Sequence, residues 1–153
     1  FKQKTAYEIM PSLVGSEMCI RDRLTIQRII RKVPVSQHVV DYVVNLVRAS
    51  RPSDPTAPEF ISRYLTWGAG PRAGQYLILA SKSRALLHGR FNVSCDDVRA
   101  VIKPVMRHRI FTNFNADAEG IKPDDIIDML VKAVSEPSVE DYAKATGAEP
   151  PAG

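Results

Sequence analysis

The sequence predicts an all-α protein, a small helical bundle that also contains short extended segments. Apolar residues recur every three or four positions in several stretches between residues 24 and 134, which is the spacing of one helix face. Prolines and glycines interrupt these stretches and mark the turns between helices. The chain has 153 residues, of which 44% are hydrophobic, so it is long enough for one domain with its own core.

The first residues differ from the rest of the chain, because no helical or alternating period continues through them. Residues 10–23 also resemble the translation of a sequencing adaptor joined to a truncated gene. We therefore expect residues 1–23 to be a non-native or disordered segment and leave them out of the fold prediction. From Leu24 an apolar stripe predicts a short helix up to Val33, because Pro34 disfavours helical geometry in the residue before it.

Two further helices are predicted in the next third of the chain. Ser36 is a good N-cap for a helix that runs to Arg48, in which valines recur at helical spacing. Three prolines between residues 51 and 58 exclude a regular helix or a central strand, so this stretch is a loop. Residues 60–67 predict a short amphipathic helix that ends at Gly68 and whose aromatic residues are core anchors.

Two longer helices are expected after Gly68. Pro71 suits the first position of a helix that runs to His88 and ends at Gly89, a natural C-terminal cap. After a brief extended piece, residues 94–97 form a capping-box start for another helix. Pro104 is expected to end or kink that second helix.

The last strong helix is predicted to begin at Pro123 and to carry its apolar face as far as Val134. The residues beyond it are mostly small and polar, so 136–153 is expected to be a flexible tail. The predicted organisation is one helical domain, residues 24–135, between this tail and the segment 1–23.

The net charge of +4 is unevenly distributed: residues 1–33 carry +4, residues 34–114 carry +6 and residues 115–153 carry −6. A basic middle segment suits DNA, an anionic nucleotide or an acidic neighbouring subunit, and charge alone does not choose between them. Residues 107–109 form one local basic cluster, which suits a phosphate or a subunit contact and equally a solvated edge. No run reaches the roughly 18 apolar residues of a membrane span, so we expect a cytoplasmic protein without a membrane partner.

The most informative stretch runs from Trp67 to Ala73 and reads WGAGPRA, because it sets Arg72 on the first turn of the helix that Pro71 begins. Arginine stays charged and offers a planar fork of donors, and a helix N-terminus adds partial positive charge at the same place. Gly70 is expected to allow an unusual backbone angle just before it. Arg72 is therefore a candidate contact for a nucleotide phosphate, although an arginine at a helix start is also typical of a solvated surface.

The residue types used for metal binding and nucleophilic catalysis form no recognisable pattern. Cys19 and Cys95 form no CxxC pair, so neither a disulfide framework nor a zinc site is indicated. The histidines share no helix at ligand spacing, so no metal is assigned to His38, His88 or His108. We also assign no catalytic residue.

Several separated stretches, taken with their order and spacing, resemble the C-terminal part of MoxR-type AAA+ ATPases. They are residues 31–36 (RKVPVS), 41–49 (DYVVNLVRA), 67–73, 89–93 (GRFNV), and 97–100 (DVRA) leading to 104–110 (PVMRHRI). The resemblance implies a lid of the AAA+ type, a small helical domain that folds over a nucleotide held by a larger ATPase domain. By the same resemblance Arg72 is the sensor 2 residue, which reaches the γ-phosphate of ATP. Gly70 stands where many relatives have serine.

The sequence lacks the phosphate-binding loop G-x-x-x-x-G-K-[ST] and a hydrophobic strand that ends in paired acids. The ATP and Mg²⁺ that the resemblance implies therefore belong to an intact protein, and the chain alone is expected to be inactive. The implied partners are its own ATPase domain, neighbouring subunits of a homo-oligomeric ring, and von Willebrand factor A domain proteins. The implied function is chaperone-like remodelling or activation of partner proteins.

A different class of function stays open at this point. A free-standing helical adaptor or DNA-binding module would direct Arg72, Lys82 and Arg84, from one helix, toward an anionic partner. The family resemblance makes a nucleic-acid partner the less favoured of the two. The genomic sequence upstream of Leu24 separates them, because only the first hypothesis requires a phosphate-binding loop there.

Overall fold

The structure is a computed structural model that describes residues 20–137, so the predictions for residues 1–19 and 138–153 lie outside the described part. The chain divides into two units, Phe1–Val33 and Pro34–Gly153. In the first unit, a helix covers residues 20–32. The short helix predicted from Leu24 is therefore confirmed and extends at least four residues further toward the N-terminus.

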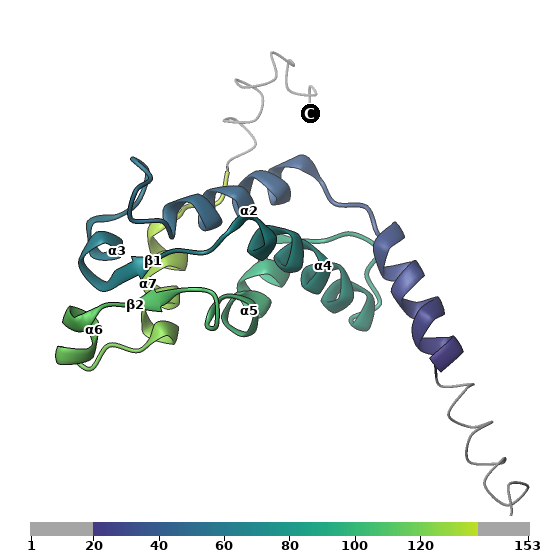
Figure 1. Ribbon diagram of the computed structural model, residues 1–153. Coiled ribbons are helices and arrows are strands. Elements are labelled where there is room, and N and C mark those ends of the chain that lie inside the picture. The colour runs from purple at the N-terminus through teal and green to yellow at the C-terminus, as the bar shows by residue number, and fades with distance from the viewer. Residues whose placement is uncertain (1–19, 138–153) are drawn as a thin grey trace, which may run out of the picture. The chain divides into compact units, whose positions relative to one another are not determined.

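The second unit is mostly helical, as the sequence predicts, with one small sheet (Figure 1). Its helices are α2 (Gln37–Ala49), α3 (Glu59–Tyr64), α4 (Pro71–Leu87), α5 (Cys95–Met106), α6 (Phe114–Ala118) and α7 (Pro123–Ala133). Its strands are β1 (Leu65–Trp67) and β2 (Phe111–Thr112). Within the described residues, no helix is long and apolar enough to cross a membrane.

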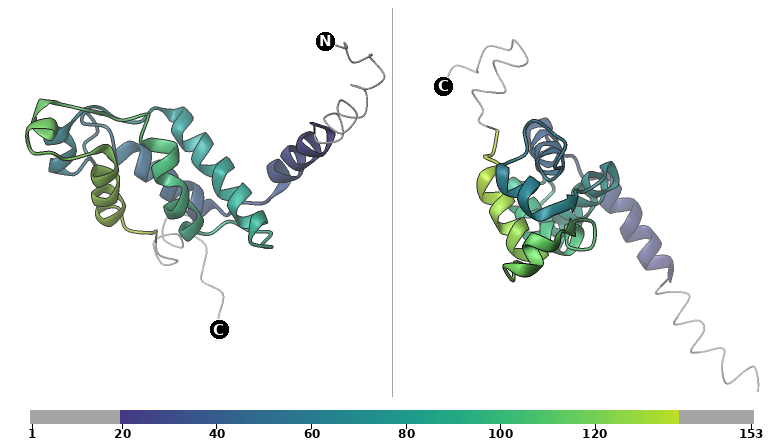
Figure 2. Two further views of the ribbon diagram at one scale, coloured as in Figure 1. Left: turned by 90° about the horizontal axis from the view of Figure 1, so that it is seen from below. Right: turned by 60° about the vertical axis from the view of Figure 1, so that its left-hand side comes forward.

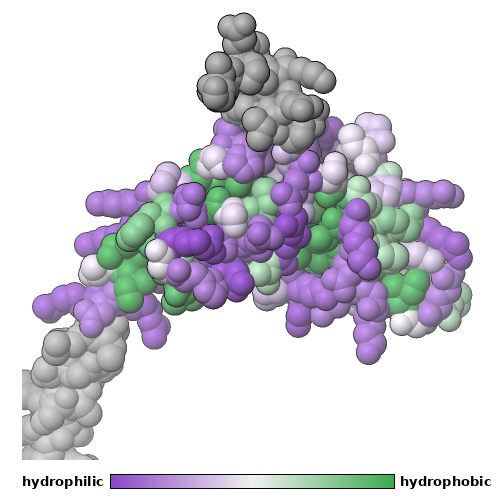
Figure 3. Space-filling model, turned by 180° about the vertical axis from the view of Figure 1, so that it is seen from behind, coloured by the Kyte–Doolittle hydropathy of each residue, from purple (hydrophilic) through white to green (hydrophobic). Residues whose placement is uncertain are grey.

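The core of this unit lies where α4 packs along α5 and against α2, while α7 covers α5 and α2 from another side (Figures 1 and 2). The helices α2, α5 and α7 bury the apolar faces that their periods predict, and burying such faces is the main stabilising term of the fold. The largest fully buried side chains include Tyr42, Leu46, Leu77, Ile102, Met106, Ile127 and Leu130. The face opposite to that of Figure 1 is mostly hydrophilic, with separate hydrophobic patches between charged side chains (Figure 3).

The prediction that one helix covers residues 60–67 is wrong in its last part. The helix α3 ends at Tyr64, and β1 pairs antiparallel with β2, with Leu65 opposite Thr112 and Trp67 opposite Phe111. Backbone hydrogen bonds to a strand distant in sequence override the local helical pattern here. Trp67 is 70% exposed, so this residue is not the core anchor that the sequence suggested.

The ends of α4 and α5 confirm two predictions and correct a third. Gly89 has φ +69 and follows the last turn of α4, which is the conformation of a glycine cap. The Asp97 carboxylate accepts a hydrogen bond from the backbone N of Ser94 at 3.1 Å, the bond that the third helical residue makes in a capping box, and a second from Ser94 Oγ at 3.1 Å. Pro104 does not end α5, which continues to Met106. Its ring is exposed on the outer face of the last turn, where a proline disturbs the packing least.

Candidate functional site

The predicted site residue, Arg72, lies on the first turn of α4, as the sequence predicts. Pro71 is the first residue of this helix and Gly70 is its N-cap. Gly70 has no side chain to cap the helix, and its carbonyl accepts a hydrogen bond from Ala73 N at 2.9 Å. The partial positive charge at the helix start is therefore open to an outside anion.

Gly70 does not adopt the unusual backbone angle that it was expected to allow. Its φ of −80° and ψ of 172° are ordinary extended values that any residue adopts. A Cβ built on Gly70 meets nothing within 4 Å, so a serine, as the resemblance gives for many relatives, would fit here without strain. The glycine that the backbone does require is Gly68.

The Arg72 side chain is exposed and makes no hydrogen bond or ion pair with any residue in the described range 20–137. Arg72 therefore does not stabilise the described fold through hydrogen bonds or ion pairs. All its guanidinium donors are available to a ligand or to water.

Two residues directly after α2 hold the segment that leads into Arg72. The buried hydroxyl of Ser50 donates to Val47 O at 2.7 Å and accepts from Ala69 N at 3.1 Å. Arg51 Nε donates to Ala69 O at 3.0 Å. Both backbone groups of Ala69 are therefore bound by consecutive residues of another element, which fixes where α4 begins.

Gly68 makes this attachment possible because the two backbones approach closely. A Cβ on Gly68 would lie 2.2 Å from Ser50 O and 2.6 Å from Arg51 Cα, distances that real atoms do not adopt. No other residue fits at this position unless the loop moves. The sequence prediction missed Ser50 and Arg51, because their partner Ala69 is distant in the chain. The local sign of their role was a small hydroxyl residue followed by an arginine at the end of an apolar helix.

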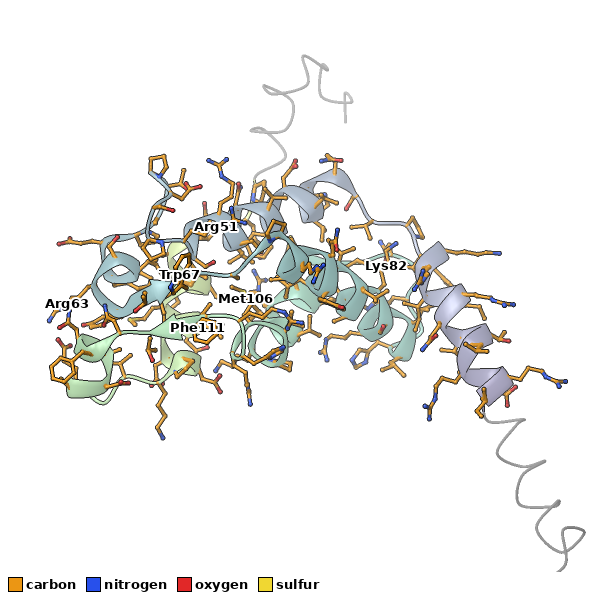
Figure 4. All side chains as sticks on the ribbon, in the orientation of Figure 1. Arg51, Arg63, Trp67, Lys82, Met106 and Phe111 are labelled. Carbon is orange, nitrogen blue, oxygen red and sulfur yellow. The ribbon has the colours of Figure 1, made fainter. Side chains whose placement is uncertain are left out.

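A hollow of ≈ 360 Å³ opens beside this attachment. Its lining comes from the segment after α2 and the segment that leads into α4: Arg51, Pro52, Ser53, Thr66, Trp67, Gly68, Ala69 and Gly70. Figure 4 shows Arg51 and Trp67 in the same part of the unit, with Phe111 on the neighbouring strand. The candidate site therefore combines an open helix start, an unpaired arginine and an adjacent hollow with an exposed indole.

The other end of α4 is held by charge. Asp97 is buried, and Arg90 donates two hydrogen bonds to its carboxylate, at 2.8 and 2.6 Å. These bonds outweigh burial and hold the pKa of Asp97 at about 2, below its usual 3.8. Arg84 Nε lies 3.4 Å from the same carboxylate. Arg84 is therefore engaged inside the domain, which counts against the alternative that directs it toward nucleic acid.

The described residues offer neither a reactive cysteine nor a metal site. Cys95 is buried at the start of α5, and burial raises the pKa of its thiol, so it is a poor nucleophile there. Among residues 20–137, no group of three or more histidine, cysteine, aspartate and glutamate side chains is placed to hold a metal ion.

Residues 34–137 thus form a small, mostly helical unit in which α4, with seventeen residues, carries Arg72 on its first turn. Residues 59–130 match the family described as the AAA lid domain. The chain belongs to the MoxR family of AAA+ ATPases, of which it carries the lid domain.

Two relatives match over different shares of the chain. The chain is 34% identical to the chaperone MoxR1 of Mycobacterium tuberculosis over 130 residues, which are 85% of this chain and 34% of that protein. It is 48% identical to the protein MoxR of Paracoccus denitrificans over 50 residues, which are 33% of this chain and 15% of that protein.

A crystal structure of a candidate ATPase from Cytophaga hutchinsonii superposes with a TM-score of 0.65 at 32% identity, over 71% of this chain and 33% of that one. The chain thus spans about a third of the length of MoxR1 and of this structure.

Proposed function

We propose that this domain is the moving lid of a MoxR-type AAA+ ATPase and that Arg72 is its sensor 2 residue, which contacts the γ-phosphate of ATP. The observation that carries the proposal is the contrast between Arg72 and its surroundings. The side chain is exposed and without partners inside the described chain, yet Ser50 and Arg51 fix the segment that leads into its helix.

The proposed mechanism follows from this combination of a fixed helix and a free guanidinium. Charge-assisted hydrogen bonds from arginine to a terminal phosphate are strong and directional. They favour the closed lid before hydrolysis and are lost when the γ-phosphate leaves, so the lid position follows the nucleotide state. Because α4 packs along α5 and α2, a pull on Arg72 moves the helical unit as a whole.

The remaining parts of the proposed ATPase lie outside this chain. The phosphate-binding loop and the groups that hold Mg²⁺ would come from an ATPase domain, since the sequence of this chain contains neither. ATP, Mg²⁺ and the cytoplasm, where ATP is supplied, are therefore proposed for the full-length gene product. Its proposed partners are neighbouring subunits of a ring and von Willebrand factor A domain proteins, which it would remodel or activate.

The experiment compares ATP turnover of the full-length gene product with that of Arg72→Ala. We expect turnover to fall about 100-fold, the scale seen when one donor to a transition-state oxyanion is removed. The melting temperature should not change, because the side chain makes no hydrogen bond or ion pair in the described fold. Arg107→Ala is the matched control, since Arg107 is also exposed but pairs with Asp124 at 3.2 Å. Wild-type turnover in Arg72→Ala would refute the proposal.

A further inference from the structure

A second arginine is held beside the helix that carries Arg72. The guanidinium carbon of Arg109 lies 4.8 Å from the centroid of the Tyr76 ring. One Nη of the same guanidinium donates to the carbonyl of Val105. Stacking on an aromatic ring and a backbone hydrogen bond together restrict a side chain that is otherwise flexible.

The position of Tyr76 connects this arginine with the proposed site. Tyr76 follows Arg72 by four residues in α4, and residues four apart are neighbours on one face of a helix, with Cβ atoms about 5–6 Å apart. The start of α4 therefore presents Arg72 and, through Tyr76, is in contact with Arg109 from the segment after α5. Two elements distant in sequence each bring a guanidinium to this surface.

Arg109 differs from most of the other cations of this unit in its charge environment. Seven of them lie within 4.0 Å of a carboxylate: Arg48, Arg63, Arg84, Arg90, Arg99, Lys103 and Arg107. Arg109 has no carboxylate partner among residues 20–137, a property that it shares with Arg72 and with Arg51, Lys122 and Lys132. Its neighbour Arg107, two residues away, does pair with an acid.

We propose that Arg109 is a second contact for the polyphosphate chain of the nucleotide, held by Tyr76 beside Arg72. The inference rests on the proposed function, since it concerns the same nucleotide. A nucleoside triphosphate carries several negative charges along one chain, which two separate guanidinium groups can share. An arginine already ordered by stacking loses little conformational entropy on binding, so its remaining donors are well placed for this role.

Nucleotide binding by the full-length gene product tests the inference. We expect Arg109→Ala to weaken ATP binding about tenfold, because one charge-assisted contact is lost. Arg109→Lys should recover only part of this loss, since lysine keeps the charge without the planar fork. Tyr76→Leu should weaken binding in the same direction but less, and Tyr76→Phe should bind as the wild type does.

Two controls separate this role from a structural or subunit contact. Arg107→Ala should leave the ATP dissociation constant unchanged, because its guanidinium is already paired with Asp124. The melting temperature and the oligomeric state of Arg109→Ala should match those of the wild type. Impaired assembly with an unchanged ATP dissociation constant would overturn the inference and assign Arg109 to a subunit interface.

The outcome also distinguishes this inference from the proposed function. If Arg72→Ala abolishes turnover while Arg109→Ala binds ATP as tightly as the wild type, the inference fails and the proposed function stands. If neither variant changes binding or turnover, both fail.

Discussion

The two ends of α4 use arginine in opposite ways. At the C-terminal end, Arg84 and Arg90 converge on the buried carboxylate of Asp97, so their charges are satisfied inside the domain. At the N-terminal end, Arg72 has no partner in the described chain, and backbone contacts to Ser50 and Arg51 hold its segment instead. The domain therefore contains arginines that stabilise the fold and one, Arg72, whose guanidinium is available to a ligand.

The largest effect on stability is expected where the segment that leads into α4 is attached to Ser50 and Arg51. Gly68→Ala should lower the free energy of unfolding by about 3 kcal/mol, because its Cβ would lie 2.2 Å from Ser50 O. Urea denaturation measures the loss. Gly70→Ala is the matched control, because a Cβ there meets nothing within 4 Å, and it should unfold as the wild type does. Equal stability of the two variants would mean that the close approach does not constrain the loop.

The second prediction tests the charge cluster around Asp97 at the C-terminal end of α4. Asp97→Asn should cost about 2 kcal/mol, because two arginines lose the buried charge that they share. Asp96→Asn, at the next position, removes an exposed partner of Arg99 and should cost less than about 0.5 kcal/mol. Chemical denaturation of both variants gives the difference, and a similar cost at the two positions would contradict the structural role of Asp97.

The stabilising effect of the Asp97 charge should decrease at acid pH. The folded pKa of Asp97, about 2, lies below its usual 3.8, so its stabilising contribution is present above pH 3.8 and is lost as the pH falls toward 2. The stability difference between the wild type and Asp97→Asn should therefore narrow over this interval. Equilibrium unfolding at several pH values measures it. A difference that does not depend on pH would show that the charge of Asp97 is not involved.

A smaller effect is expected at Ser50. Ser50→Ala removes the acceptor of Ala69 N, and a buried backbone donor without a partner costs about 1–2 kcal/mol. Thermal unfolding measures this loss. Ser53→Ala, which also borders the hollow but contacts neither backbone group of Ala69, is the control and should melt with the wild type. If Ser50→Ala is as stable as that control, the hydroxyl does not hold the segment.

Local signals in the sequence predicted much of this fold, and nonlocal contacts explain the rest. The helices α2 and α7 could be predicted from their apolar periods, and α4 from Pro71 at its start and Gly89 just after its end. The pairing of β1 with β2 depends on a segment distant in the chain, so no local pattern at residues 65–67 could reveal it. Of the two outcomes expected for Pro104, an end of the helix is wrong, because the cost of a proline to a helix depends on its position and exposure, which the sequence alone does not show.

The candidate site shows the same division. The position of Arg72 was predictable, because a proline and a glycine mark a helix start and the motif resembles a known family. Its lack of partners and the attachment by Ser50 and Arg51 were not, because both depend on which residues the fold brings together. The resemblance supplied the proposed role, and the contacts supply a physical reason why this arginine is suited to it.

The most direct test of the central claim compares the affinities for ATP and ADP in the full-length gene product and in Arg72→Ala. If Arg72 contacts the γ-phosphate, the substitution should weaken ATP binding about tenfold or more and leave ADP binding unchanged, so that the preference for ATP falls. Arg90→Ala, which disrupts the opposite end of α4, should alter stability without changing this preference. An unchanged ratio of the two affinities in Arg72→Ala would contradict the account.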